Sequence, residues 1–438
     1  MSDREVLVIG GGPAGVAAAL EMARGGLKVT LCEQGPRLGG AIHRQPDDPS
    51  RRVRVPKAQR QRWQALAEAL AASPVTVLCR HMFAGVEGSG AVLLEDRASG
   101  RIVTRHPAAL VLALGGVERA TPVPGWQLPG VVTAGGLQMM MKSTGRAPDG
   151  DVLLAGSGPL LVAVAAQLTA LGKAPVAVLE RSTSAVSLRA LAGLIRAPAY
   201  LWEAAGYLLP LTKAGIRLQR GASVRSIVPA GDRLSVTIVD TIGLEQRLVV
   251  DRVALHDGLL PNGNGTTPAP NGPFTVLAGD CREVLGGVAA IADGRLAGLA
   301  VLARLGQAAP DLAGAAATLR RERRTQSALN TLFDYSGSDA AHLPDDTVIC
   351  RCEGRTLGQL RGMLAAGDRV SAREIKLNGR FGMGACQGRF CAEWVAAFVA
   401  SQRDGQPPQV AEIVGSRWPV KPVPVSAFVD LPPSSPSE

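Results

Sequence analysis

Val6-Leu-Val-Ile-Gly10-Gly-Gly12-Pro-Ala-Gly15 is an apolar run that leads into closely spaced glycines, and helix-forming residues follow it. This order predicts a strand, a tight loop and a helix. Gly10 permits a sharp turn, Gly12 lets the backbone approach a pyrophosphate, and Gly15 lets the helix pack close to the strand. The N-terminus of such a helix attracts anions, because its N–H groups are unpaired and the helix dipole is positive there.

A second apolar run ends in an acid at the position that dinucleotide folds use. Lys28-Val-Thr-Leu-Cys-Glu33 follows the predicted helix. Glu33 lies roughly 20 residues beyond the glycines, where a carboxylate can hold ribose hydroxyls. Glycine spacing alone is also compatible with a purely structural turn. Strand, helix and terminal acid together favour a dinucleotide site.

Later glycines indicate which dinucleotide binds here. Gly39 and Gly40 follow the acid, and a distant strand ends in Gly279-Asp280 before a small-residue stretch over 286–294. This pairing is typical of FAD, whose adenine half binds the N-terminal fold while a Gly-Asp turn meets the flavin phosphate and the ribityl chain. Gly115 ends another apolar strand that opens toward the same cofactor. The candidate FAD-binding residues are Gly10, Gly12, Pro13, Ala14, Gly15, Glu33, Gln34, Gly39, Gly40, Gly115, Gly279 and Asp280.

The same pattern recurs in the middle of the chain. Asp151-Val-Leu-Leu-Ala-Gly156-Ser-Gly158 starts the second copy, and Pro175-Val-Ala-Val-Leu-Glu180 ends in another acid. The duplication indicates two Rossmann-like dinucleotide domains, the second inserted in the first. Leu161 replaces the third glycine and opposes the close helix approach that a tightly bound pyrophosphate needs. Gly156, Gly158 and Glu180 are candidate ligands for an adenine nucleotide, either ATP or NAD(P), and a second site without a useful nucleotide is the alternative.

Length and composition set the broad class. A chain of 438 residues exceeds one ordinary core and predicts about two to four folding units. Met1 is not followed by the pattern of a signal peptide. The nearest candidate for a membrane span is the uncharged stretch 152–172, but Gly156 and Pro159 break it into a strand, a loop and a helix, so it does not read as a membrane span. We expect a cytoplasmic protein without a transmembrane segment.

The net charge of +10 is compatible with nucleic acid, an anionic membrane surface or an acidic partner. Local arginine runs occur at 51–54 and 320–324, and neither is interleaved with aromatic residues. A solvated face or a docking surface for another protein is therefore favoured over nucleic acid.

Four of the seven cysteines lie in the last quarter of the chain: Cys350, Cys352, Cys386 and Cys391. Thiolates select iron–sulfur clusters or zinc, and zinc sites usually use paired CxxC knuckles. The pattern favours a [2Fe–2S] cluster, because the first pair is a tight CxC, the second pair is wider and glycines lie beside them. Such a cluster transfers one electron at a time, whereas a flavin accepts electrons in pairs. Zinc and incidental thiols are the alternatives. Cys32, Cys79 and Cys281 are expected to be ordinary buried residues.

Several stretches together carry a family resemblance: Gly39-Gly-Ala-Ile-His-Arg-Gln45, Gly115-Gly-Val-Glu-Arg119, Pro124-Gly-Trp126, Leu128-Pro-Gly130, Gly156-Ser-Gly-Pro-Leu-Leu161, Cys386-Gln-Gly-Arg-Phe-Cys391 and Arg417-Trp-Pro-Val-Lys-Pro-Val423. The chain resembles the α (A) subunit of heteromeric FAD-dependent amino-acid and opine dehydrogenases. That group includes octopine and nopaline oxidases, D-hydroxyproline and L-proline dehydrogenases and hydrogen cyanide synthase. The resemblance covers nearly the whole chain.

The resemblance implies a division of labour between subunits. The substrate, an amino acid or an opine such as D-hydroxyproline, octopine or nopaline, would be oxidised on a β subunit of the D-amino-acid-oxidase type that carries its own FAD. A small γ subunit is a further candidate partner. This chain would carry electrons through FAD in its first domain and a cluster in a C-terminal ferredoxin-like domain. The sequence offers no evident acid, base or nucleophile constellation for substrate chemistry, and His43 is interpreted as a neighbour of the flavin.

The predicted fold class is α/β, with two Rossmann-like dinucleotide-binding domains, the second inserted in the first, and a small C-terminal ferredoxin-like [2Fe–2S] domain. The expected boundaries are 1–148 and 256–308 for the FAD-binding domain, 149–255 for the inserted domain, 309–345 for a helical linker, 346–405 for the [2Fe–2S] domain and 406–438 for a tail. Strands at 75–78 and 91–94 are expected to form a β-meander inside the first domain.

Two other functions stay open at this point. One is a self-sufficient NAD(P)H-dependent reductase that contains FAD and [2Fe–2S]. The other is a scaffold that binds nucleotide only for assembly.

Overall fold

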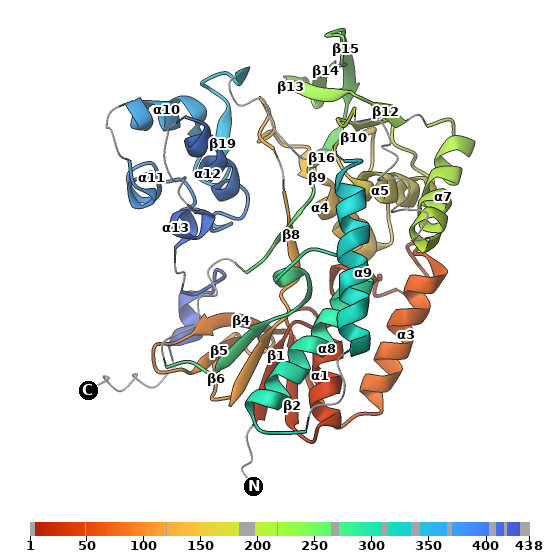
Figure 1. The fold of residues 1–438 in the computed structure, drawn as a ribbon. Helices are drawn as coiled ribbons and strands as arrows, with labels where there is room; N and C mark the ends of the chain where they lie inside the picture. The colour runs from red at the N-terminus through yellow and green to blue at the C-terminus, as the bar shows by residue number, and fades with distance from the viewer. Residues whose placement is uncertain are drawn as a thin grey trace.

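The structure is a computed structural model that describes residues 5–48, 50–119, 121–183, 198–216, 218–263, 271–308, 313–333, 342–365, 370–402, 409–415 and 418–429. The first unit is built on a parallel sheet (Figure 1) whose strands are β1 (Glu5–Ile9), β2 (Lys28–Glu33), β3 (Thr76–Cys79), β7 (Ala109–Leu112) and β18 (Phe274–Leu277). Their order is β18-β7-β1-β2-β3. This order predicts a ligand crevice at the carboxyl end of β1, where the direction of the strand order reverses.

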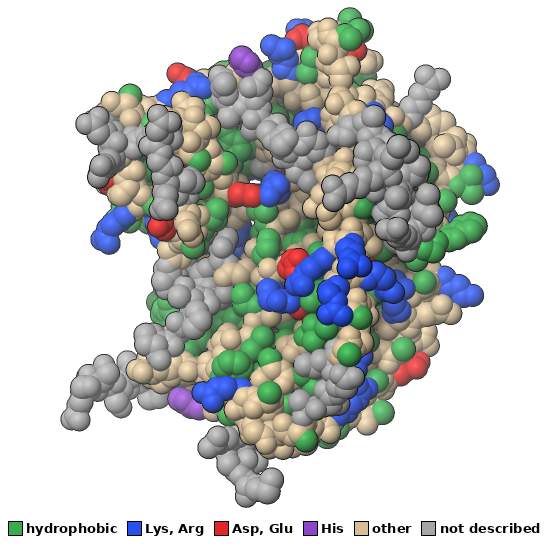
Figure 2. All heavy atoms as spheres, viewed as in Figure 1, with side chains coloured by type: hydrophobic (Ala, Val, Ile, Leu, Met, Phe, Trp, Pro, Cys, Tyr) green, Lys and Arg blue, Asp and Glu red, His purple; other side chains and the backbone are tan. Residues whose placement is uncertain are grey.

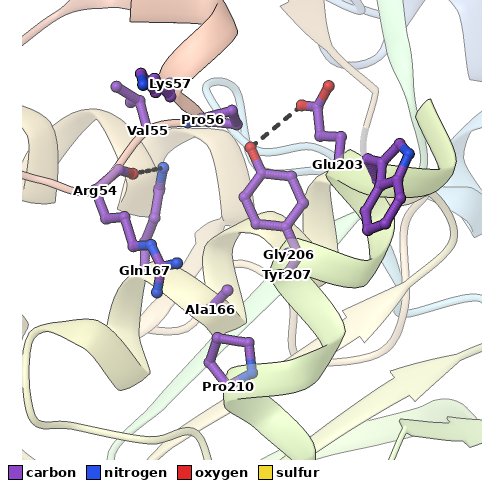
Figure 3. Close-up of a pocket in the computed structure, with 11 residues that line it drawn as sticks. Arg54, Val55, Pro56, Lys57, Ala166, Gln167, Glu203, Gly206, Tyr207 and Pro210 are labelled. Atoms are coloured by element: carbon purple, nitrogen blue, oxygen red, sulfur yellow. Dashed lines mark hydrogen bonds between the residues drawn. The ribbon is translucent and has the colours of Figure 1, made fainter. Parts of the chain in front are cut away.

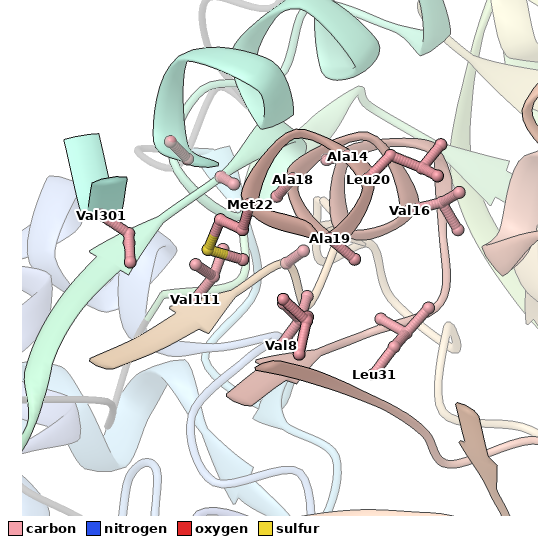
Figure 4. Packing of buried hydrophobic residues seen from close by; sticks show 14 of the residues in the cluster. Val8, Ala14, Val16, Ala18, Ala19, Leu20, Met22, Leu31, Val111 and Val301 are labelled. Carbon is pink, nitrogen blue, oxygen red and sulfur yellow. The ribbon is translucent and has the colours of Figure 1, made fainter. Parts of the chain in front are cut away.

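The two faces of this sheet are covered differently, because successive side chains of a strand point to opposite faces. Val6 and Val8 belong to the core formed with α1 (Pro13–Arg24) and α8 (Gly287–Arg304), which Figure 4 shows from close by. Leu7 and Ile9 belong to the core on the other face. A side chain at Gly294 of α8 would collide with the backbone of α1, so the two helices cross at very short range.

The other face carries a three-stranded antiparallel meander, made of β4 (His81–Val86), β5 (Val92–Asp96) and β6 (Arg101–Arg105). The sequence correctly placed 91–94 in a meander but was wrong about 75–78. Residues of β3 pair in parallel with β2, for example Val77 with Leu31, and form the edge of the main sheet. An edge strand with one exposed face alternates in polarity as a meander strand does, which explains the error.

The second unit repeats the parallel architecture. Its strands are β9 (Val131–Thr133), β10 (Val152–Gly156), β11 (Ala177–Glu180), β12 (Leu218–Arg220) and β16 (Arg252–His256), in the order β12-β11-β10-β16-β9. The helices are α4 (Ala134–Thr144), α5 (Pro159–Ala170) and α7 (Pro198–Lys213), and an antiparallel sheet of β13 (Ser223–Ala230), β14 (Arg233–Val239) and β15 (Glu245–Val250) is attached. Because β9 pairs with β16, residues expected before the boundary at 148/149 belong to the second sheet.

The chain leaves the first unit and returns to it through one pair of antiparallel strands, β8 (Gly116–Glu118) and β17 (Leu259–Pro261). All strands of the second sheet lie between them in the sequence. The described structure therefore confirms two Rossmann-like units, one inserted in the other.

The C-terminal unit is mainly helical. It contains β19 (Val348–Cys350), β20 (Arg355–Thr356), α10 (Leu357–Ala365), α11 (Ala372–Leu377), α12 (Ala392–Ser401) and α13 (Val410–Val414). Its core runs from Ile349 through Leu360 and Val395 to Val414. The described elements do not show the expected ferredoxin-like arrangement. Apolar residues spaced three and four apart on α10 and α12 bury one face of each helix. The core also extends past residue 405, into the segment expected to be a tail.

Three further helices flank the nucleotide units: α2 (Gly40–His43), α3 (Lys57–Ala71) and α9 (Ala313–Asn330). Figure 2 shows Lys and Arg side chains gathered on the face where α9 lies, and α9 contains the run 320–324. Part of this charge is neutralised locally, since Arg323 forms a two-pronged ion pair with Glu283. Among the described residues, no helix combines the length and apolarity needed to cross a bilayer.

Candidate functional site

The first glycine loop has a geometry that only glycine permits at two positions. Gly10 has φ +107°, and a Cβ there would collide with the carbonyl oxygen of Ala113. A Cβ at Gly15 would collide with the carbonyl oxygen of Gly10. Gly12 differs, because a Cβ there meets only the Cα of Gly40, at 3.8 Å. The surroundings of Gly12 thus leave space in front of α1, as a cradle for a pyrophosphate requires.

The N-terminus of α1 is available to an anion. Its N-cap is Gly12, which has no side chain to cap the helix, Pro13 begins the helix, and the first turn holds no acidic residue. The segments expected around a flavin meet at this turn: Gly40 approaches Gly12, and Gly279, with φ +66°, approaches Ala14. The structure therefore brings Gly12, Ala14, Gly40 and Gly279 together around one helix end.

The acid at the end of β2 is held in place. Glu33 is 7% exposed, its Oε2 accepts a hydrogen bond from the Gly11 N–H at 2.8 Å, and its Oε1 accepts one from the Gly35 N–H at 2.7 Å. The neighbouring Gln34 accepts a hydrogen bond from Lys421, whose Nζ lies 2.6 Å from its Oε1. Lys421 comes from the far end of the chain, and no motif in the sequence indicated that it lies here.

The turn after β18 is fixed by buried carboxylates. Asp293 Oδ2 accepts a hydrogen bond from the Gly279 N–H at 2.7 Å, and Asp280 Oδ1 accepts one from the Leu285 N–H at 3.2 Å. Burial raises the pKa of Asp280. The Gly-Asp turn is therefore rigid, and its acid lies in a poorly solvated environment.

Lys142 reaches from α4 of the second unit to α2 of the first. Its Nζ donates to the carbonyl oxygens of Ala41 and Ile42, at 3.1 Å each, and the residue is 3% exposed. Burial, followed by repulsion from Arg44, lowers the pKa of Lys142 to about 8. No sequence pattern indicated this buried ammonium, because a lone lysine on a helix is normally solvated.

His43 stacks on Trp63, with ring centroids 4.9 Å apart. Burial lowers the pKa of His43 to about 4, with contributions from the cations of Lys142 and Arg62. The imidazole is therefore neutral near pH 7. This fits a packing role beside the first site better than that of a charged acid catalyst.

The second loop holds its acid much as the first loop holds Glu33, with a hydroxyl as an additional donor. Glu180 is 2% exposed, and its carboxylate accepts hydrogen bonds from the Ser157 hydroxyl at 2.6 Å and from the N–H groups of Gly158 and Ser182 at 3.0 and 2.9 Å. Leu161 is fully buried in the core that includes α4 and α5. The Glu180 oxygens are thus engaged by their own loop, and position 161 serves packing.

The four late cysteines lie together as two pairs. The Cys350 and Cys391 thiols hydrogen-bond each other, as do those of Cys352 and Cys386. The hydrogen bond from Cys391 lowers the pKa of Cys350 to about 6, and burial opposes this shift. The same contact and burial raise the pKa of Cys391. All seven cysteines are free thiols in the described chain.

Backbone N–H groups surround these sulfurs. Cys350 accepts from the N–H groups of Cys352, Glu353 and Gly382, and the last of these also serves Cys391. Within the described ranges, no group of three or more His, Cys, Asp or Glu residues is arranged to hold a single metal ion. Paired thiols with N–H donors fit a two-iron cluster better than one tetrahedral zinc, because each iron takes only two protein thiolates.

The cysteine unit docks on the nucleotide units through specific contacts. The indole Nε1 of Trp126 donates to the Val348 carbonyl oxygen at 2.5 Å, and the Arg351 guanidinium lies 5.2 Å from the centre of the Trp126 ring. Trp126 is 1% exposed. The segment 124–126, quoted above for its family pattern, is therefore part of this junction.

A cavity of about 220 Å³ lies away from both nucleotide loops, between the start of α3, α5 and α7. In Figure 3, the Gln167 side-chain amide donates a hydrogen bond to the Arg54 carbonyl oxygen, and the Tyr207 hydroxyl donates one to the Glu203 carboxylate. None of the predicted cofactor residues lines it. Its walls therefore add nothing to the predicted flavin and cluster sites.

Comparison with known proteins assigns the family. The model of the pyridine nucleotide-disulphide oxidoreductase family matches residues 4–271. The chain belongs to that family. It is a FAD-dependent oxidoreductase, and the family accounts for the paired nucleotide folds.

Two curated relatives match nearly the whole chain. An opine oxidase subunit from Agrobacterium tumefaciens (strain Ach5) is 32% identical over 98% of this chain and 92% of its own length. The hydrogen cyanide synthase subunit HcnB of Pseudomonas protegens is 31% identical over 98% of this chain and 97% of its own length. These relatives confirm the resemblance seen in the sequence, and both are named as subunits of larger enzymes.

A solved structure extends the likeness in fold. L-proline dehydrogenase from P. horikoshii superposes with a TM-score of 0.64 at 19% identity, covering 97% of this chain and 79% of that chain. The fold of this oxidoreductase is thus shared along almost its full length, including the C-terminal unit.

Proposed function

We propose that this chain is the electron-transfer subunit of a heteromeric dehydrogenase. FAD occupies the first nucleotide site, a [2Fe–2S] cluster is bound by Cys350, Cys352, Cys386 and Cys391, and an amino acid or opine is oxidised on a partner subunit of the D-amino-acid-oxidase type. When bound, the flavin exchanges electrons in pairs and the cluster exchanges them singly. A small γ subunit is compatible with this assignment.

The observation that carries the proposal is the pairing of the four thiols inside a unit that docks on the flavin-type fold. Thiol pairs surrounded by N–H donors suit a two-iron cluster, and Trp126 holds this unit beside the crossover between the two nucleotide units. A cluster has a clear use next to a flavin. It has little use in a fold that only binds nucleotide for assembly.

The chain's own residues bind and position rather than catalyse. The N-terminus of α1 would receive the pyrophosphate, Glu33 would hold the adenosine ribose, and Gly279 with Asp280 would meet the flavin phosphate and ribityl chain. His43 is neutral and its ring is stacked on Trp63, so it contributes packing to the site and no charge. The proposal therefore places substrate chemistry elsewhere, on the partner.

Steady-state assays of the purified chain, alone and with its partner, test this proposal. We expect oxidation of an amino acid or opine only in the presence of the partner, with an artificial dye as acceptor. Substrate oxidation by the single chain would contradict the proposal.

A self-sufficient NAD(P)H-dependent reductase is the second candidate, because the second loop keeps its left-handed glycines Gly156 and Gly158. Leu161, buried where the first loop has its third glycine, argues against it. Anaerobic mixing with NADH distinguishes the two: rapid bleaching of the flavin would favour the reductase, and slow or absent bleaching is the expected result.

A further inference from the structure

Arg389 lies in the loop between Cys386 and Cys391 and joins three separate segments of the chain. Its Nε donates to Asn262 Oδ1 at 3.1 Å, and its Nη2 donates to the Val420 carbonyl oxygen at 3.0 Å. Its Nη1 donates to the Cys386 carbonyl oxygen at 3.2 Å and to Gln387 Oε1 at 2.9 Å. All three guanidinium nitrogens are thus used, two of them outside the cysteine loop.

Asn262 connects this guanidinium to the first nucleotide site. It is 9% exposed, its Nδ2 donates to the Leu114 carbonyl oxygen at 3.4 Å, and its N–H donates to the Gly115 carbonyl oxygen at 3.3 Å. Its own carbonyl oxygen accepts a weak hydrogen bond from the Cys281 thiol, with sulfur and oxygen 3.6 Å apart. Asn262 therefore contacts both the strand end at Gly115 and the turn that follows Asp280.

Val420 provides the second anchor. It is 5% exposed, belongs to the core beneath the first sheet, and its N–H donates to the Ala84 carbonyl oxygen at 2.8 Å. A parallel contact runs from Gln387 Nε2 to the Pro419 carbonyl oxygen at 3.0 Å. The cysteine loop is thus fixed to the flavin-type unit on two sides.

We propose that Arg389, acting through Asn262, is the positioning residue that sets the placement of the cysteine loop relative to the flavin turn, and so the rate of electron exchange between the two centres. This inference rests on the proposed function, because it requires both centres to be present. When both groups are bound, the flavin would supply one electron at a time and the cluster would accept it, and Arg389 would hold the cysteine loop against Asn262 during this exchange. Arg389 itself makes and breaks no covalent bond.

The geometry requires arginine specifically. Its planar fork carries several donors in fixed directions, so it can bond Asn262, Val420 and the loop carbonyl at the same time. A lysine retains the charge but lacks the fork. Charge alone is therefore insufficient, and Arg389→Lys should behave like Arg389→Gln.

The test uses the full chain with its bound cofactors. Arg389→Gln, Arg389→Lys, Asn262→Ala and the double variant Arg389→Gln/Asn262→Ala are compared with Arg373→Gln, which removes an exposed arginine on α11. FAD, iron and sulfide contents and the absorbance spectrum are measured first. Flash reduction of the flavin then gives the rate at which the electron equilibrates with the cluster.

We expect wild-type cofactor contents and spectra in Asn262→Ala and an exchange rate lowered by up to about 100-fold, the loss that a misplacement of about 1 Å can cause. The Arg389 variants should lose at least as much, because they also remove the bond to Val420, and the double variant should lose no more than the Arg389 single variant, because Asn262 acts through Arg389. Arg373→Gln should match wild type. A wild-type exchange rate in Asn262→Ala, or fully additive losses in the double variant, would overturn the inference. Absence of iron or flavin from the wild-type chain would instead refute the proposed function.

Discussion

Arg119 and Glu393, 274 positions apart in the sequence, form a bidentate ion pair: Nε lies 2.9 Å from Oε2 and Nη2 lies 2.5 Å from Oε1. Arg119 directly follows β8, and Glu393 lies on α12, two residues after Cys391. The pair therefore joins the crossover between the nucleotide units to the helix that follows the last cysteine.

Neutralising this ion pair should slightly weaken the contact between the C-terminal unit and the crossover between the nucleotide units. The two side chains are 31% and 34% exposed, so solvent screens them and the coupling should be about 0.5–1 kcal/mol. Urea unfolding of the wild type, Arg119→Gln, Glu393→Gln and the double variant, at low and high salt, gives a double-mutant cycle that measures this coupling free energy. A coupling of zero at low salt would contradict the assigned contact.

Gly12→Ala and Gly15→Ala should separate binding from folding. A Cβ at Gly12 finds open space, whereas one at Gly15 collides with Gly10. We expect Gly12→Ala to lose FAD, while its apoprotein keeps the thermal midpoint of the wild-type apoprotein. Gly15→Ala should also lower the free energy of unfolding by about 1–3 kcal/mol. Full FAD content in Gly12→Ala would show that the cofactor does not lie against this loop.

Glu180→Gln should destabilise the second unit even without a nucleotide. The carboxylate accepts from one hydroxyl and two N–H groups, and an amide would place its NH₂ against one of these donors. The expected loss is about 1–3 kcal/mol in the free energy of unfolding, measured by urea titration. Glu87→Gln, at a half-buried loop position where the carboxylate accepts a long hydrogen bond of 3.3 Å from the Ser89 hydroxyl, is the control. Equal stability of the two variants would mean that Glu180 is not held as described.

Lys142 predicts a specific pH dependence. Its pKa is lowered to about 8 in the folded chain from 10.5, so between these values the unfolded chain binds more protons than the folded chain. Stability should therefore rise with pH from about 8 to 10.5, as the penalty for the buried charge disappears. The rise should amount to about 2–3 kcal/mol relative to Lys142→Met, whose curve lacks this contribution. Parallel curves for the two proteins would contradict the assignment.

Much of the nucleotide architecture could be predicted from short-range patterns. The glycines that begin at Gly10 and the strand that ends in Glu33 identified the first unit. The same pattern at Gly156 and Glu180 identified the second. Each pattern reflects local backbone geometry, which a few neighbouring residues determine. The structure confirms both units and their nesting.

Other features could not be predicted because distant residues create them. β9 is three residues long and has no period of its own, so its place in the second sheet depends on β16. Asn262, Lys142 and Lys421 are isolated polar residues whose partners lie about 100 or more positions away. Arg389 was visible inside the cysteine motif, but its partners were not.

The central claim is that one chain holds both a flavin and a two-iron cluster. The most direct measurement is the quantification of iron, acid-labile sulfide and FAD in the purified chain, together with its visible spectrum. We predict about two iron atoms, about two sulfides and about one FAD per chain, with the iron and sulfide lost together in Cys386→Ser. Zinc in place of iron, or a chain that binds neither sulfide nor flavin, would contradict the account.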